Sequence, residues 1–174
     1  LNVSKALLKK YNLEKALSYI DKEIKIKNQN NLLNSLSLKL SIFEEIGESA
    51  GIINLSSQIL QSFPNNERAL YSRALAYEKE GNILSMSKDF DEMIKLNQYN
   101  SIALNAYGYS LALHKLHLDK SEKLIRKALD IRPGQAAILD SLAWVLYLKG
   151  SYKEAAKYSS LAYSKDQDPE IVEH

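Results

Sequence analysis

Cysteine is absent from the sequence, and glycine and proline are scarce, at 6 and 3 residues among 174. Without cysteine the chain cannot form a disulfide framework, a thiolate zinc site or a cysteine nucleophile. A sandwich or barrel needs turn residues at intervals of about 8–12 positions, which so few glycines and prolines do not supply. The composition is 45% apolar and 25% charged, as in globular proteins. Its many leucines, lysines, alanines and glutamates favour helices.

Neither a large excess of charge nor a long apolar run is present. Lys and Arg total 23 and Asp and Glu total 21, a formal net charge of +2. A dedicated nucleic-acid-binding domain normally carries a strong basic excess, so we expect no nucleic acid among the partners. The longest apolar run, Leu142 to Leu148, is far shorter than the about 20 residues of a membrane-spanning helix, so we expect no span.

Apolar and small residues recur along the chain at intervals of 34 or 35 positions, which is the pattern of a repeat protein. The clearest apolar column consists of Leu36, Leu70, Leu104 and Leu139. A column of small residues consists of Ala74, Gly108 and Ala143. A single additional residue accounts for every interval of 35, and we place it in the loop near residues 114–118.

Each repeat has the apolar pattern of two helices joined by a short turn. In the segment 67–100, Gly81-Asn82 separates one helical stripe from a second. The stripes consist of Leu70, Ala74 and Tyr77, and of Met86, Phe90 and Met93. This pattern predicts an all-α fold, a solenoid of paired helices that runs through residues 1–174 as one domain. The predicted units are 1–32 (with a shortened first helix), 33–66, 67–100, 101–135 and 136–169, followed by a truncated capping helix at 169–174.

Capping motifs predict where two of the second helices begin. Asp119 with Glu122, and Ser151 with Glu154, each have the spacing of a capping box. In that motif two side chains satisfy free amide groups at the helix N-terminus. We therefore expect the second helices of the last two units to begin at these residues.

Helix-turn-helix units of 34 residues with these columns resemble the tetratricopeptide repeat (TPR) family over nearly the whole chain. In the best-matching unit, 136–169, the small residues, the turn glycine and the aromatic residue are Ala143, Gly150, Tyr152, Ala155 and Ala162. Met86 and Ser121 depart from the alanine that the family usually has in the second helix. The resemblance implies a right-handed α-solenoid with a concave groove, lined by the first helices, that binds a peptide or a protein.

A narrower resemblance lies in residues 103–112 and 138–147, with the sequences ALNAYGYSLA and ILDSLAWVLY, and in the closing segment 168–174. These segments are similar to a bacterial subfamily of TPR proteins. Many of its members are exported, lipid-anchored outer-membrane lipoproteins, and some act as adaptors for cell-envelope proteases. The resemblance implies a periplasmic or outer-membrane location, with a cytoplasmic one as the alternative. Because residue 1 is leucine and not methionine, we expect a processed protein or an excised fragment.

Catalytic and metal-binding patterns are weak. His114 and His117 have a spacing that two metal ligands can share, but no third ligand accompanies them, so we interpret them as residues of a solvent-facing loop. Carboxylates cluster at Asp89, Asp91 and Glu92, which we place on the solvated face of a helix. The sequence has no glycine-rich phosphate loop and no serine–histidine–acid set in a recognisable context. We therefore expect no enzyme and no cofactor.

Aromatic residues are the best candidates for a binding site, because tyrosine and tryptophan contribute strongly at protein interfaces. The chain has 11 tyrosines and one tryptophan. Tyr77, Tyr152 and Tyr158 fall in the repeating apolar columns, and we predict that they pack in the core. The stripe predicted to face the groove consists of Arg68, Tyr71, Asn105, Tyr109, Asp140, Trp144 and Tyr147. The alternative for Trp144 is burial beneath the helix that begins at Pro169.

We therefore predict a non-enzymatic protein-interaction module whose groove binds a peptide or protein. The resemblance adds an adaptor role in the bacterial cell envelope. Two alternatives remain open, a self-assembling scaffold and a regulatory repeat segment of a larger enzyme. Truncation of the last helix should leave an apolar face of Leu142, Leu146 and Leu161 partly bare. Through that face we expect association into a homo-dimer.

Overall fold

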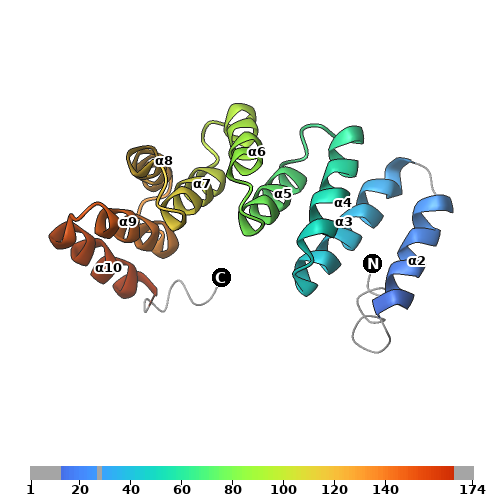
Figure 1. Ribbon diagram of the computed structural model, residues 1–174, viewed down its shortest axis with the longest axis horizontal. Coiled ribbons are helices and arrows are strands. Elements are labelled where there is room, and N and C mark those ends of the chain that lie inside the picture. Colours follow the sequence, from blue (N-terminus) through green and yellow to red (C-terminus); the bar gives the residue numbers. More distant parts are fainter. Residues whose placement is uncertain (1–12, 27–28, 167–174) are drawn as a thin grey trace. The chain divides into compact units, whose positions relative to one another are not determined.

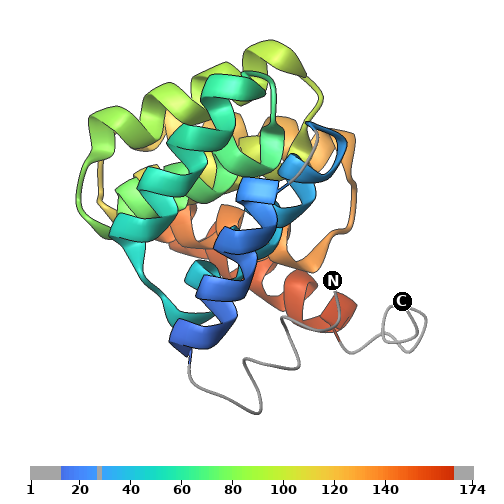
Figure 2. The ribbon, with the colours of Figure 1, turned by 90° about the vertical axis from the view of Figure 1, so that its right-hand side faces the viewer.

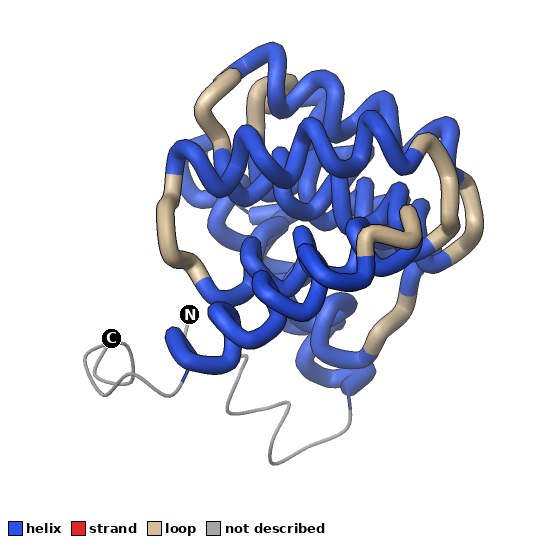
Figure 3. The backbone as a smooth tube through the Cα atoms, turned by 90° about the vertical axis from the view of Figure 1, so that its left-hand side faces the viewer, coloured by secondary structure: helices blue, strands red, loops and turns tan. Residues whose placement is uncertain are grey.

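The computed structural model describes residues 13–26 and 29–166, and all regular structure in these ranges is helical (Figure 3). The helices are α2 (Leu13–Ile26), α3 (Gln29–Ile46), α4 (Ser49–Ser62), α5 (Glu67–Lys79), α6 (Ile83–Leu96), α7 (Ser101–Leu113), α8 (Leu118–Ile131), α9 (Ala136–Leu148) and α10 (Tyr152–Asp166). They pack in successive pairs (Figure 1), which confirms the all-helical prediction. None of these described helices is both long and apolar enough to cross a membrane. The capping helix predicted at 169–174 lies outside the described residues.

The chain divides into two compact units, unit 1 of residues 1–89 and unit 2 of residues 90–174. In unit 1, α2 lies beside α3 (Figure 2), and α3, α4 and α5 contact one another in sequence order. The main core of unit 1 consists of Leu36, Leu40, Ile52, Leu55, Ile59, Ala69 and Ala76. Leu36 and Leu70 of the predicted apolar column are 1% and 3% exposed.

Within unit 1, an ion pair and a hydrogen bond of Arg73 connect α4, α5 and the first half of α6. Asp89 of α6 is 5% exposed and accepts hydrogen bonds from Arg73 Nε at 2.8 Å and Arg73 Nη2 at 2.7 Å. Arg73 of α5 also donates from Nη1 to Ser57 Oγ of α4 at 2.9 Å. The hydrogen bond to Asp89 raises the pKa of Arg73, although burial acts in the opposite direction. The prediction that Asp89 lies on a solvated face is therefore wrong, because its partner comes from another helix.

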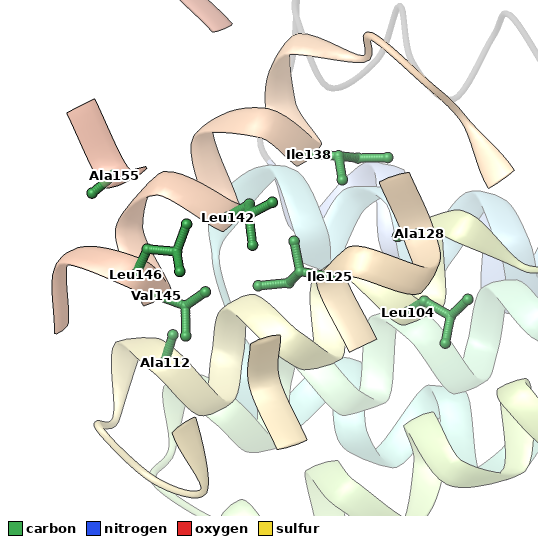
Figure 4. Packing of buried hydrophobic residues seen from close by; sticks show 9 residues of the cluster. All are labelled: Leu104, Ala112, Ile125, Ala128, Ile138, Leu142, Val145, Leu146 and Ala155. Carbon is green, nitrogen blue, oxygen red and sulfur yellow. The ribbon is translucent and has the colours of Figure 1, made fainter. Parts of the chain in front are cut away.

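The core of unit 2 lies among α7, α8, α9 and α10. Figure 4 shows Ile125 of α8 beside Leu142 and Val145 of α9, within one buried cluster. Leu142 and Leu146 are 0% and 2% exposed, whereas Leu161 is 39% exposed. The predicted bare apolar face is therefore wrong for two of its three leucines, because their side chains enter this cluster. Leu161 is exposed as predicted, and association into a homo-dimer through this end of the chain stays a prediction.

Helices α7 and α8 approach each other closely at Gly108. A Cβ atom at this position would lie 2.9 Å from the backbone oxygen of Ser121 and 2.6 Å from Cγ1 of Ile125. Ser121, fully buried, donates a hydrogen bond from its hydroxyl to the Gly108 carbonyl at 2.6 Å. The small-residue column is thus a packing requirement at this position. Ser121, in place of the usual alanine, adds a hydrogen bond between the two helices.

The turn between α7 and α8 contains the additional residue of the repeat. Residues 114–117 join these helices, whereas 80–82 and 149–151 join the equivalent helices α5–α6 and α9–α10. The structure thus places the additional residue in the loop that the 35-residue intervals predicted. Gly81 and Gly150 have φ angles of 71° and 80°, and Lys115, with φ 54°, adopts this left-handed conformation in the longer turn.

The start of α8 differs from the predicted capping box. Its N-cap is His117, which makes no side-chain cap hydrogen bond, so the prediction for Asp119 is wrong. Asp119 lies in the first turn of α8 and accepts a hydrogen bond from Lys149 Nζ at 2.6 Å. In the repeat register His117 is equivalent to Asn82 and Ser151, so the capping box was placed two residues too late. Ser151 directly precedes α10, as predicted.

Candidate functional site

A groove of about 570 Å³ opens in unit 2 among α7, α9 and α10. Four of the predicted site residues line it, namely Tyr109, Asp140, Trp144 and Tyr147. Asp140, Trp144 and Tyr147 follow one another along α9 at intervals of four and three positions, so they share one face of that helix. Tyr109 joins them from α7. The α9 part of the predicted stripe and its α7 aromatic therefore line one groove.

Three aromatic rings form a continuous series in this groove. Trp144 stacks on Tyr147, with ring centroids 5.8 Å apart and planes inclined by 15°. Tyr147 in turn contacts Tyr152, with centroids 5.4 Å apart and an angle of 60°. Trp144, Tyr147 and Tyr152 are 37%, 53% and 63% exposed. Their faces are therefore accessible to a ligand.

These exposures test one of two expectations about aromatic residues. Tyr152 was predicted to pack in the core, and this is wrong, because its ring is exposed at the first position of α10 and lines the groove. The turn between α9 and α10 contains only residues 149–151, so Tyr152 lies close to the end of α9. This short turn is the sequence feature from which the position of Tyr152 could have been predicted. Trp144 remains exposed, and the helix at Pro169 that was the alternative cover lies outside the described residues.

Asp140 gives the groove its only formal charge among the lining residues that the structure describes. The carboxylate is exposed on α9, one turn before Trp144. Within the described ranges it makes no hydrogen bond and no ion pair. The lining contains no lysine, arginine or histidine. The groove therefore combines exposed aromatic faces with one uncompensated negative charge.

Asn105 occupies α7 one turn before Tyr109 and does not line the groove. Its Oδ1 atom is buried and has no hydrogen-bond partner in the described part of the chain. An unsatisfied buried acceptor costs about 1–3 kcal/mol. The predicted contact between Asn105 and the backbone of a peptide stays a prediction.

The two remaining predicted site residues, Arg68 and Tyr71, lie on α5 in unit 1. Arg68 Nη2 donates to Ser41 Oγ at 2.7 Å and to Glu44 Oε2 at 3.0 Å. Tyr71 lines a smaller pocket of about 430 Å³ that Glu44 also borders, and burial raises the pKa of its phenol. Ser72 donates a hydrogen bond to the second oxygen of Glu44. The polar groups on this face of unit 1 therefore satisfy one another.

The two histidines considered as metal ligands lie in the turn between α7 and α8, His114 at the end of α7 and His117 at the start of α8. Among the described residues, no three His, Cys, Asp or Glu side chains come together in a way that could hold a metal ion. The arrangement in unit 2 is suited to binding: it offers ring surface and one carboxylate in an open groove.

Comparison with known proteins extends these observations. No protein-family model matches the chain. A TPR repeat-containing protein of Pseudomonas aeruginosa is 34% identical over 115 residues, which are 66% of this chain and 20% of that protein. The chain thus spans about a fifth of the length of the curated relative that it matches.

Several solved structures are similar in fold. MamA 41-end from Desulfovibrio magneticus RS-1 has a TM-score of 0.79 at 18% identity, over 96% of this chain and 94% of that chain. A tetratricopeptide repeat protein from Parabacteroides merdae has a TM-score of 0.81 at 17% identity, over 96% and 66%. YrrB, described as a TPR protein with an unusual peptide-binding site, has a TM-score of 0.71 at 16% identity, over 98% and 86%. At these identities the similarity establishes the fold alone.

Proposed function

We propose that the chain, which is similar in sequence to a TPR repeat-containing protein and in fold to a tetratricopeptide repeat protein, is a protein-interaction module and that unit 2 binds a peptide segment of its partner. TPR repeat proteins are typically non-catalytic binding modules. The proposed site is the groove lined by Tyr109, Asp140, Trp144 and Tyr147, together with Tyr152. The peptide lies along α9, with apolar groups against the rings and polar groups toward Asp140.

The observation that carries this proposal is the exposure of three neighbouring aromatic rings in one groove. Covering about 100 Å² of apolar surface on such a ring contributes about 2.5 kcal/mol before ordering costs. Tyrosine and tryptophan lose little side-chain entropy on binding because they have few rotatable bonds. Trp144 and Tyr147 are already held by their stacking contact. The site is thus organised before a ligand arrives.

Support also comes from YrrB, whose structure is described as having an unusual peptide-binding site. That description concerns YrrB, and the shared fold makes a peptide a reasonable ligand class for this chain. We further propose Asn105, Arg68 and Tyr71 as weaker contacts for longer partners. A partner at Arg68 must compete with the hydrogen bonds that Arg68 makes to Ser41 and Glu44.

An adaptor role in the bacterial cell envelope is a separate and more specific proposal. It rests on the similarity of residues 103–112 and 138–147 to exported TPR lipoproteins. Fractionation of the source cells, followed by detection of the full-length protein in each fraction, tests it. Recovery in the periplasm or outer membrane supports the proposal, and recovery in the cytoplasm alone contradicts it.

Peptide binding is tested by selecting linear peptides from a random displayed library on the immobilised chain. The affinity of an enriched, fluorescently labelled peptide is then measured by fluorescence polarisation. Truncating a central aromatic anchor costs about 2 kcal/mol or more, so we expect Trp144→Ala to weaken binding at least about tenfold. The matched control is Tyr163→Ala, which removes a tyrosine of α10 that is 70% exposed and does not line the groove.

Thermal melting of each variant accompanies the binding measurement, because truncation of a partly buried tryptophan also affects stability. Retained affinity in both Trp144→Ala and Tyr109→Ala, with the fold intact, would move the site away from this groove. Failure of the library to yield any peptide would contradict peptide binding itself.

A further inference from the structure

We propose that the groove of unit 2 selects a peptide that carries a basic side chain, preferentially arginine, bound between the Asp140 carboxylate and the ring of Trp144. This inference rests on the proposed function, since it names the chemistry of the ligand at the same site. Three independent features of the groove lead to it: its charge, its unoccupied ring faces and the spacing of its residues along α9.

The charge of the groove requires a cation. Asp140 is the one ionised side chain among the described lining residues, and it makes no ion pair or hydrogen bond within the described ranges. A ligand that covers this carboxylate with an aliphatic group removes water from it without compensation, which is costly. An acidic group adds repulsion. A guanidinium or ammonium group compensates the lost water with an ion pair.

The ring faces of the groove suit the same cation. Elsewhere the chain itself places cations over aromatic rings, in the pairs Lys39–Phe43, Arg73–Tyr77, Lys120–Tyr107 and Arg126–Tyr158. Among the described residues, no such cation covers Trp144, Tyr147 or Tyr152. Tryptophan is the aromatic residue that attracts cations most strongly. The groove therefore leaves its best ring face free for a cation from outside.

The spacing along α9 favours arginine over lysine. Asp140 and Trp144 are four residues apart, which is about 6 Å along a helix axis. A planar guanidinium can lie on the indole ring and direct two N–H groups toward a carboxylate at this distance. The buried Ala143 also lines the groove, so no large side chain stands between the two contacts on that helix.

The experiment compares the peptides selected by the unaltered chain with those selected by Asp140→Asn, which keeps the shape of the side chain and removes its charge. The matched control is Asp130→Asn on α8, which removes an exposed carboxylate that does not line the groove. One selected peptide is then synthesised twice, with its basic residue and with norleucine in that place. Affinities of both peptides are measured for all three proteins by fluorescence polarisation of the labelled peptide. Because Trp144 is the only tryptophan of the sequence, its intrinsic fluorescence reports separately whether the groove is occupied.

We expect the unaltered chain and Asp130→Asn to enrich arginine or lysine at one peptide position, and Asp140→Asn to lose that enrichment. The basic peptide should bind Asp140→Asn about fivefold more weakly. The norleucine peptide should bind Asp140→Asn at least as tightly as it binds the unaltered chain and Asp130→Asn, because no charged group is then desolvated. Peptides that occupy the groove without basic enrichment, or equal losses for both peptides, would overturn this inference and leave the proposed function standing. If no peptide is selected, the proposed function fails first.

Discussion

The pocket faces of unit 1 and unit 2 use their polar and aromatic groups in opposite ways. In unit 1, Glu44 accepts hydrogen bonds from both Arg68 and Ser72, so its charge is compensated within the fold. In unit 2, Asp140 has no such partner among the described residues, and Trp144 presents an exposed ring beside it. The same repeat architecture thus produces one face whose carboxylate is hydrogen-bonded within the fold and one face whose carboxylate has no partner among the described residues.

This difference identifies which face is prepared to bind. A ligand at the unit 1 face must replace hydrogen bonds that already exist, so its net gain is small. A ligand at the unit 2 groove covers aromatic surface and compensates a charge without breaking any contact made by the described residues. Exposure alone does not separate the two faces, because Arg68 is exposed as well. The decisive property is whether the exposed group already has a partner.

The largest effect we expect is on the stability of unit 1. Asp89→Ala leaves the guanidinium of Arg73 without its buried partner, and breaking a buried pair in this way costs about 3–5 kcal/mol. Because the Arg73 side chain is 20% exposed, we expect about 3 kcal/mol, measured by urea unfolding. Hydrogen exchange should become faster in α4 and α5. Equally faster exchange in α9 and α10 would contradict the separation of the two units.

A smaller loss of stability is expected from overpacking in unit 2. Gly108→Ala places a Cβ against Ser121 and Ile125, and overpacking costs about 1–3 kcal/mol. The higher helix propensity of alanine offsets up to about 1 kcal/mol of this. We expect a net loss of about 1–2 kcal/mol with faster exchange in α7 and α8, because each repeat contacts mainly its neighbours. Equal loosening before residue 67 would show that the effect is not local.

Lowering the pH should reduce the stability of unit 2, because Glu122 of α8 then becomes protonated. The hydrogen bond from Lys149, at 2.6 Å, lowers the pKa of Glu122 from its ordinary 4.5 more than burial raises it. A carboxyl with a lowered pKa stabilises the fold fully above its ordinary pKa, and this contribution is lost as the pH falls through the lowered value. We expect Glu122→Gln to cost about 1 kcal/mol at neutral pH. In thermal melts the difference between variant and unaltered protein should shrink as the pH falls below the ordinary pKa of 4.5 and through the lowered value; a difference that stays constant over this fall in pH would contradict this assignment.

The smallest effect should follow from Arg68→Ala. Arg68 is engaged by Ser41 and Glu44, so we expect the affinity for a selected peptide to change by no more than about twofold. The measurement is the same polarisation titration that compares Trp144→Ala with Tyr163→Ala. A loss as large as that of Trp144→Ala would make the unit 1 face an equal part of the site and remove the distinction between the two units.

Much of the candidate site follows from helical periodicity. Asp140, Trp144 and Tyr147 share a face because of their spacing on one helix, and the repeat interval carries that face back to Tyr109 on α7. The position of Tyr152 was mistaken because its repeat column indicated packing, whereas its ring lies against Tyr147 across a turn. Contacts across a turn depend on the angle between two helices, which spacing along one helix does not reveal.

The 34-residue repeat in the sequence was sufficient to determine that this chain is helical, that its helices come in pairs, and that a small residue is needed at Gly108. These properties depend on local spacing, which a linear pattern contains. Which polar and charged groups find partners was decided by tertiary structure alone. Asp89 is paired with Arg73, while Asp140 is left uncompensated among the described residues. Both are aspartates on helices, and they differ because pairing depends on which side chains neighbouring helices bring within hydrogen-bond distance.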